Sequence, residues 1–450
     1  MSEYLTRRRL LQSMVAASVA GVVTGGGAAA PTQQQSGWPQ PRYDGANTCY
    51  NPRATPPRAE PTVETLVSPS ETLGRPFVVT GGRIFTVLGE RTTVAYASDD
   101  GTEAWRWSNS VLPGGSGTPL LGTANNLFVV SENGNVLSAV DPTAGERKWL
   151  VQPSEPRLAR ASDGTLYYPI VQNLVSVDEN GEQQRDELTP FDFSGLGVTA
   201  DRIYGTTTEN VVALNTADGA RQWTKELSSP GNMPVISDGQ VYVRTDTITA
   251  LDAGDGTIRW EADDLPSRPT TPVAVTPEML YVGADSDSTQ ATFFALNTET
   301  GAIEWRAELG SPTTPSSSPA TVRPAVTSDT VYVTSVDSTV HALDPSTGEV
   351  LWRETFDVEV GPPVPAENTL YIGTEANEIL AFRTQSTQDD DPSDPDGDGD
   401  DDTPDETDEK TDDSEGSDSG DGFGPGFGVP AALTALGGAG YLLGRRRGEE

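Results

Sequence analysis

Short runs of alternating apolar and polar residues, separated by turn residues, recur along the middle of this chain. Each unit contains a proline-led apolar stretch, a strand centred on Tyr or Phe, a strand that reads Ala-Leu-Asp or a close variant, and a strand that carries a Trp. β-Branched and aromatic runs bounded by Asp-Gly, Asn-Gly and Ser-Asp turns are typical of antiparallel β-meanders. The pattern therefore predicts four short strands per unit, and it shows no helical period.

The clearest copy of the repeat runs from Ala342 to Trp352, with Asp344 and the pair Thr347-Gly348 between them. Seven copies align, and an eighth is cut short. Gly348 allows the positive φ of a tight turn between the third and fourth strands. A large indole can be buried between neighbouring units if a small residue leaves room for it, so we expect these positions to be structural docking sites. The other clear Ala and Trp pairs are Ala139 and Trp149, Ala213 and Trp223, Ala250 and Trp260, and Ala295 and Trp305.

Equivalent positions in successive units lie 37 to 47 residues apart, which is the size of a radial propeller blade. The predicted fold is all-β: an eight-bladed β-propeller of four-stranded antiparallel blades over residues 61–383. The last unit ends near Arg383 without its outer strand, so we expect residues 62–68 to supply that strand and close the ring. The third unit is one residue short and has Arg185 at the Trp position. We interpret the nearby Phe191 and Phe193 as packing that replaces the indole, with a second candidate binding site at Phe191-Asp192-Phe193 as the alternative.

The segments before the propeller indicate export. Residues 1–30 contain Arg7 and Arg8 before a weakly apolar, small-residue run, which is typical of a twin-arginine signal peptide, with a membrane anchor as the alternative. Residues 31–60 are rich in proline and polar residues and predict an extended lead-in.

The segments after the propeller differ sharply in charge. Residues 384–422 hold 18 acidic residues and one lysine, which predicts a disordered spacer, although Asp394 to Asp405 also has the spacing of a calcium loop. Residues 423–450 are apolar until a final arginine cluster and are just long enough for a terminal hydrophobic helix that spans a bilayer.

Charge and rare residues exclude several classes of function. The chain has 67 acidic and 29 basic residues, a net charge of −38, so a nucleic-acid partner is not expected. Abundant acid with few lysines suggests a halophilic source. A single cysteine, Cys49, and a single histidine, His341, exclude an intrachain disulfide and metal sites built from several Cys or His residues.

The frame Ala-x-Asp-x-x-Thr-Gly-x-x-x-Trp resembles the tryptophan-docking motif of the pyrroloquinoline-quinone (PQQ) repeat family. Trp38-Pro39, Asp44 and Asn47-Thr48 also resemble the lead-in of archaeal members. The family includes quinoprotein dehydrogenases and non-enzymatic propellers such as the BamB-like assembly factors, so the repeat implies fold and not cofactor. The resemblance to the enzymes stops at the repeats, because the adjacent cysteine pair and long inserted loops of quinoprotein alcohol dehydrogenases are not found here.

The segment Pro425-Gly426-Phe427, followed by an apolar run and arginines, closely resembles the PGF-CTERM sorting signal of haloarchaeal surface proteins. This resemblance implies removal of the tail by an archaeosortase and attachment of a lipid. A retained transmembrane anchor is the alternative.

Two expanded loops mark a candidate partner-binding rim. In a four-stranded meander, loops between the second and third strands leave from the same face as the connections between blades. Both expansions are predicted to lie on that face: residues 285–290, with Asp285 and Asp287, and residues 311–321, with Thr313 and Ser316. Simple loop growth is the alternative explanation.

These features together predict an exported binding or scaffold module, anchored at its C-terminus on the extracellular face of an archaeal membrane. We expect it to be monomeric, to bind other envelope or secreted proteins, and to have no catalytic, cofactor-binding or metal-binding residues. The alternative function is a PQQ-dependent dehydrogenase that uses calcium and oxidises alcohols or sugars.

Overall fold

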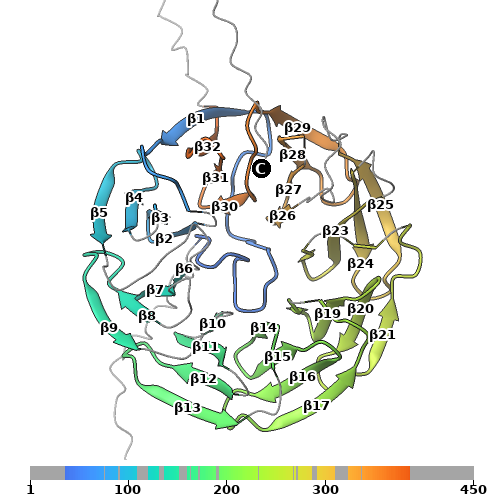
Figure 1. Ribbon diagram of the computed structural model, residues 1–450. Helices are drawn as coiled ribbons and strands as arrows, with labels where there is room; N and C mark the ends of the chain where they lie inside the picture. The colour runs from blue at the N-terminus through green and yellow to red at the C-terminus, as the bar shows by residue number, and fades with distance from the viewer. Residues whose placement is uncertain are drawn as a thin grey trace, which may run out of the picture. The chain divides into compact units, whose positions relative to one another are not determined.

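The computed structural model describes residues 36–385, apart from residues 75–76, 90–91, 109–119, 131–135, 152–159, 163, 171–172, 189–191, 232, 267, 270–271, 286–290, 310–322 and 336. The chain divides into two units, residues 1–387 and 388–450, and every described residue belongs to the first unit. The described residues of that unit form a ring of four-stranded antiparallel sheets (Figure 1).

Blades 1 to 4 follow one another along the chain. Blade 1 contains β2 (Val78–Thr80), β3 (Arg83–Leu88), β4 (Thr92–Ala97) and β5 (Glu103–Ser108). Blade 2 contains β6 (Leu120–Gly122), β7 (Leu127–Val130), β8 (Leu137–Val140) and β9 (Arg147–Val151). Blade 3 contains β10 (Arg160–Ser162), β11 (Thr165–Ile170), β12 (Asn173–Val177) and β13 (Gln183–Leu188). Blade 4 contains β14 (Gly195–Val198), β15 (Arg202–Thr206), β16 (Asn210–Asn215) and β17 (Arg221–Glu226).

Blades 5 to 7 continue the series. Blade 5 contains β18 (Val235–Ser237), β19 (Gln240–Arg244), β20 (Ile248–Asp252) and β21 (Ile258–Glu261). Blade 6 contains β22 (Ala274–Val275), β23 (Met279–Asp285), β24 (Ala291–Asn297) and β25 (Ile303–Glu308). Blade 7 contains β26 (Arg323–Val326), β27 (Val331–Thr334), β28 (Thr339–Leu343) and β29 (Val350–Thr355).

A further sheet, the closing sheet, joins the two ends of the propeller. It contains β30 (Val364–Ala366), β31 (Thr369–Gly373) and β32 (Ile379–Thr384), with β1 (Pro61–Val67) as its outer strand. β1 pairs antiparallel with β32, and Val63 lies opposite Phe382. This pairing confirms the prediction that residues 62–68 provide the missing strand.

The predicted fold class needs correction in its blade count. The described residues form seven blades from contiguous four-stranded units, and not the predicted eight. The last repeat ends after three strands, so the closing sheet takes its fourth strand from residues 61–67. In addition, every element in the described part of the chain is a strand. The predicted terminal hydrophobic helix and the acidic linker lie outside the described residues. Within the described residues, no helix has the length and apolar character needed to span a membrane.

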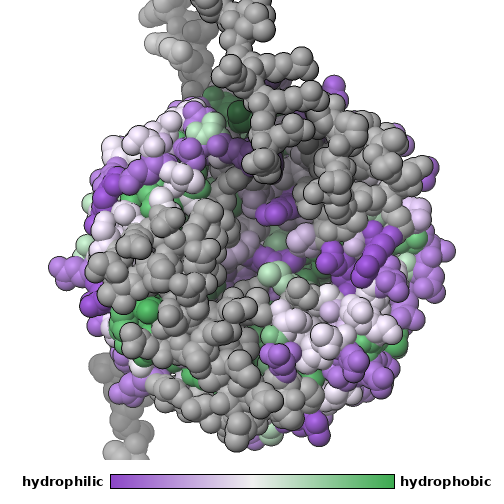
Figure 2. All heavy atoms as spheres, in the orientation of Figure 1, coloured by the Kyte–Doolittle hydropathy of each residue, from purple (hydrophilic) through white to green (hydrophobic). Residues whose placement is uncertain are grey.

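The strands become more polar from the axis to the circumference. The inner strands are buried along most of their length, whereas outer strands such as β17 and β29 bury mainly their Trp. Figure 2 shows hydrophilic residues around the described circumference of the ring. In each of the seven contiguous blades the pairing of the third and fourth strands contains a bulge, for example between Ala295 and Leu296. Such a bulge increases local twist, which suits radially arranged blades.

Candidate functional site

Residues 36–54, which we call the axial segment, run through the centre of the ring (Figure 1). The predicted extended lead-in therefore lies inside the propeller, at the place where a propeller can hold a ligand. Carbonyl groups of this segment accept hydrogen bonds from inner-strand N–H groups of five blades, at 2.6–2.9 Å. The donors are Gly122 to Pro39, Val198 to Gly45, Ile236 to Ala46, Val275 to Thr48, and Val326 to Cys49.

Blade 1 and the closing sheet also bond to the axial segment. Trp38 and Val79 exchange both backbone hydrogen bonds, and the Glu367 N–H donates to the Ser36 carbonyl at 2.8 Å. An inner strand is the free edge of its sheet, and an unpaired buried N–H costs about 1–3 kcal/mol. The axial segment therefore satisfies main-chain groups that a dry, empty channel would leave unpaired.

Two fully buried asparagines hold the axial segment in place. The Asn47 side-chain amide donates to the carbonyls of Leu196 and Pro234, both at 2.8 Å, and so joins blades 4 and 5. The Asn51 amide donates to Ser36, Gly37 and Pro365, at 2.9–3.0 Å. Asn47 has a φ of 62°, a left-handed conformation that Asn tolerates better than most residues.

Asp44 stabilises a tight turn of the axial segment. Its carboxylate accepts hydrogen bonds from the Thr48 N–H at 2.9 Å and from the Thr48 hydroxyl at 2.8 Å. Burial raises the pKa of Asp44, and the Thr48 hydrogen bonds and the Arg42 charge offset part of that rise. Asp44 and Asn47-Thr48 thus organise the segment locally, in positions that the sequence singled out without a structural reason.

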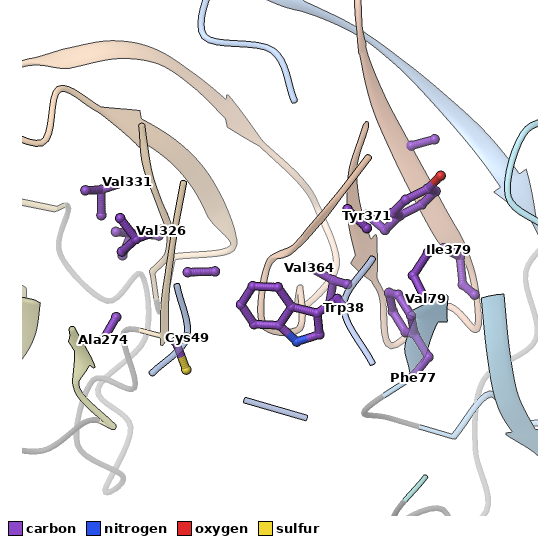
Figure 3. Close-up of a cluster of buried hydrophobic side chains, with 14 of the residues drawn as sticks. Trp38, Cys49, Phe77, Val79, Ala274, Val326, Val331, Val364, Tyr371 and Ile379 are labelled. Carbon is purple, nitrogen blue, oxygen red and sulfur yellow. The ribbon is translucent and has the colours of Figure 1, made fainter. Parts of the chain in front are cut away.

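Apolar residues of the axial segment belong to a core cluster shared with the surrounding sheets. Trp38 is 2% exposed and its ring centroid lies 5.3 Å from that of Tyr43. Figure 3 shows Trp38 beside Val364, and Cys49 beside Ala274 and below Val326. Cys49 is therefore buried inside the channel, which makes it a packing residue.

The Trp residues of the repeat lie at the junctions between blades. Each predicted Ala lies directly opposite its Trp, for example Ala250 opposite Trp260. The indole N–H then donates to a main-chain carbonyl on the opposite side of the same junction, as Trp260 of blade 5 does to Thr298 of blade 6. These bonds are Trp105 to Pro142, Trp149 to Glu179, Trp223 to Ala253, Trp260 to Thr298, Trp305 to Pro345, and Trp352 to Pro57, at 2.8–3.1 Å. The cross-strand partners in the other predicted copies are Ala139 and Trp149, Ala213 and Trp223, Ala295 and Trp305, and Ala342 and Trp352.

The turn glycine of each following blade packs on the indole face. A Cβ atom on Gly301, which has a φ of 72°, would lie 2.5 Å from the Trp260 ring, and one on Gly348 would lie 2.4 Å from the Trp305 ring. The glycine is therefore required by close approach as well as by its backbone conformation. Sequence reasoning identified only the conformational requirement.

The last junctions depend on the N-terminal part of the propeller. The Trp352 indole and the Tyr332 hydroxyl both donate to the Pro57 carbonyl, at 3.1 Å, where an eighth turn would otherwise stand. At the junction between the closing sheet and blade 1, Leu66 contacts Gly101, and the Tyr371 hydroxyl donates to Ser98.

The junction between blades 3 and 4 has no repeat tryptophan. Arg185 lies opposite Ser176 in β12 and β13, and its side chain is outside the described residues. Phe193 is buried in a cluster that contains residues of both blades, and it packs against Gly205. This position agrees with the interpretation of Phe193 as replacement packing, whereas Phe191 is outside the described residues.

The predicted partner rim is described only at its base. Asp285 is the last residue of β23, and Ala284 bridges to Pro269 in the connection from blade 5. Asp287, Thr313 and Ser316 lie outside the described residues, as do the processing residues Arg7, Arg8, Pro425, Gly426 and Phe427.

His341 is a buried strand residue between Val333 and Arg353. Its Nε2 lies 3.1 Å from the Ser335 hydroxyl, and burial lowers its pKa from 6.5 to about 4. The Asp337 carboxylate contacts Ser335 and not the histidine ring, so these three residues do not form a nucleophile–base–acid relay.

The described residues do not fit the PQQ and calcium of the alternative function. The axial segment fills the ring centre with its own main chain, and no group of three or more His, Cys, Asp or Glu residues that could hold a metal occurs in the described ranges. No catalytic step through those groups follows from this arrangement.

The repeats match a family model described as the outer membrane protein assembly factor BamB, over residues 53–184, 172–317 and 289–389. The chain belongs to this family. Membership agrees with the repeat-family resemblance, since the matched residues span all the blades.

Comparisons with individual proteins cover smaller parts. The BamB protein of Yersinia pestis is 26% identical over 202 residues, which cover 42% of this chain and 50% of that protein. The serine/threonine-protein kinase AfsK of Streptomyces griseus is 35% identical over 150 residues, which cover 31% of this chain and 18% of the kinase. The chain thus spans half or less of the length of these relatives.

A solved enzyme has a similar fold. The quinohemoprotein alcohol dehydrogenase of Comamonas testosteroni superposes with a TM-score of 0.56 at 12% identity, covering 78% of this chain and 82% of the enzyme. At that identity the likeness concerns the fold alone, so it does not distinguish a BamB-like function from an enzymatic one. That distinction depends on the residues at the axis and at the rim.

Proposed function

We propose that this BamB-family propeller is a non-catalytic binding or scaffold module of the cell envelope. The observation that carries the proposal is the axial segment, whose carbonyls pair with the inner strands where a dehydrogenase would need space for a quinone. The Yersinia pestis relative is an outer membrane protein assembly factor, which supports a role in holding other proteins. The partners are other envelope or secreted proteins, and the propeller acts as a monomer.

The location proposed is the outer face of an archaeal membrane. Arg7 and Arg8 support export by a twin-arginine route, and Pro425-Gly426-Phe427 supports sorting and anchoring at the C-terminus. The acidic spacer at residues 384–422 would hold the propeller away from the membrane, and the surplus of acid supports a high-salt environment. Mass spectrometry of the mature protein tests both ends: intact residues 1–30 and 423–450 would contradict processing.

The decisive functional experiment is reconstitution of the full chain with PQQ and calcium, followed by dye-linked assays on alcohols and aldoses. We expect no turnover above that of the protein-free mixture. Turnover that saturates with substrate would replace the scaffold proposal with the dehydrogenase alternative. A quinoprotein dehydrogenase assayed in parallel provides the positive control.

The proposed partner surface is the rim built from residues 285–290 and 311–321. Replacing both loops with short turns and repeating proximity labelling at the cell surface should remove specific neighbours from the labelled set. An unchanged set would exclude this rim and leave the scaffold role to another face.

A further inference from the structure

Three arginines lie on one face of the propeller where blades 5 and 6 meet. Arg244 ends β19, and Arg268 lies in the connection from β21 to β22, so both are on the face that carries the connections between blades. Arg42 of the axial segment reaches the same face, because its guanidinium contacts the Val273 carbonyl and the Met233 sulfur, which directly precede the inner strands β22 and β18.

Main-chain contacts bring the three side chains to one place. The Arg244 carbonyl accepts a hydrogen bond from Gly231, two residues before the Met233 that Arg42 contacts. The Arg244 guanidinium is directed toward the Pro269 carbonyl at 3.4 Å, beside Arg268. Pro269 in turn bridges to Ala284, at the base of the proposed partner rim.

The positive charge at this place is only partly balanced. Arg42 is 7% exposed, and its Nε is buried without a hydrogen-bond partner in the described residues. The Asp44 carboxylate interacts with the Arg42 charge, but its hydrogen bonds go to Thr48. Asp246 lies 3.7 Å from Arg268, and both side chains are largely exposed, so solvent weakens that pair.

Arg268 and Arg42 lie close enough to Arg244 for their charges to act on it. Burial lowers the pKa of Arg244, and the charges of Arg268 and Arg42 lower it further. In a chain with a net charge of −38, three cations held together against repulsion stand out from the surrounding surface. A bound oxyanion would relieve the repulsion and accept charge-assisted hydrogen bonds from guanidinium groups.

We infer that Arg42, Arg244 and Arg268 form an oxyanion-binding site that takes a carboxylate or phosphate group. This inference rests on the proposed binding function and gives its ligand a chemical class. Arg42 forms the buried floor of the site, and Arg244 and Arg268 form its accessible side. The site adjoins the base of the rim loop that begins at Asp285, so a partner on the rim can place an acidic group there.

Titration calorimetry of the full chain with citrate and with inorganic phosphate tests the site. We expect saturable binding of at least one of the two probes, and the stronger probe identifies carboxylate or phosphate as the preferred group. R244Q should weaken that binding by about tenfold, since it removes one charge-assisted interaction. R268Q should have a smaller effect, because Arg268 is more exposed.

The matched control is R306Q, which removes the same charge from an exposed position on the outer strand β25. It should leave binding unchanged. Equal weakening by R244Q and R306Q would show general attraction to a cation-bearing surface and overturn the site, as would the absence of saturable binding by both probes. Thermal melting of each variant distinguishes lost binding from lost folding. Turnover with PQQ and calcium is a separate readout, so failure of the site and failure of the scaffold proposal are distinguishable.

Discussion

The circumference and the axis of this propeller join the blades by different chemistry. At the circumference, a Trp of one blade packs on the turn glycine of the next and donates to a nearby carbonyl, as Trp260 does with Gly301 and Thr298. At the axis, one non-repeating segment accepts hydrogen bonds from the inner strands of six blades. The first device uses side chains that recur in the sequence, and the second uses main chain that leaves no repeating pattern. The repeat therefore determines the fold, whereas the axial segment determines whether the central channel has room for a ligand.

Removing the axial segment should have the largest effect. Deleting residues 36–54, which spares the Pro57 acceptor, exposes the inner edges of six blades, removes the acceptor of Glu367 in the closing sheet and removes the buried Trp38. At about 1 kcal/mol net per lost hydrogen bond, we expect a loss of several kcal/mol and a large fall in melting temperature. A synthetic peptide of residues 36–54 added in excess should restore part of the lost melting temperature. An unchanged melting temperature would show that the axis does not join the blades.

A single docking indole should matter less than the whole axis. Trp260→Ala removes a buried ring and its bond to Thr298, and we expect a loss of roughly 3–5 kcal/mol in a urea unfolding experiment. Trp260→Phe should lose less, because it keeps most of the packing. Trp107→Ala, which truncates a half-buried Trp on β5, is the matched control and should cost less than Trp260→Ala. Equal losses at the two positions would contradict the docking role.

Alanine substitutions at two turn glycines distinguish the cost of a steric clash with an indole from the cost of a positive φ. Gly301 and Gly239 both have a φ of 72°, but only a Cβ on Gly301 would meet an indole, at 2.5 Å. Gly239→Ala should therefore cost about 1 kcal/mol from its conformation alone. Gly301→Ala should cost clearly more in the same thermal melts, since the Trp260 ring must move. If the two losses match, the glycine contributes only its φ.

The smallest effect concerns pH. Burial lowers the pKa of His341 from 6.5 to about 4, so the histidine binds its proton more weakly in the folded than in the unfolded chain. The stability that this provides is complete above pH 6.5 and is lost as the pH falls toward about 4. His341→Gln should therefore have a flatter stability profile between those values than the parent. Parallel profiles in urea titrations would contradict the neutral, buried histidine.

Much of the ring could be predicted because its contacts depend on residue type. The Ala–Trp frame identified the docking positions, and the truncated repeat at Arg383 indicated that residues 62–68 close the ring, as β1 does. The axial path could not be predicted, because a carbonyl of Gly45 or Thr48 bonds as any carbonyl would. Only Trp38, Asn47 and Asn51 give a side-chain signal there. The arginine site was missed because Arg42, Arg244 and Arg268 meet only once the axial segment is inside the ring.

Hydrogen exchange at the inner-strand amides tests the central claim most directly. The N–H groups of Gly122, Val198, Ile236, Val275 and Val326 donate to the axial segment, so we predict that they exchange as slowly as amides of the central strands of the same blades. Rapid exchange at these five amides, with slow exchange in the central strands, would show an open channel and contradict the account.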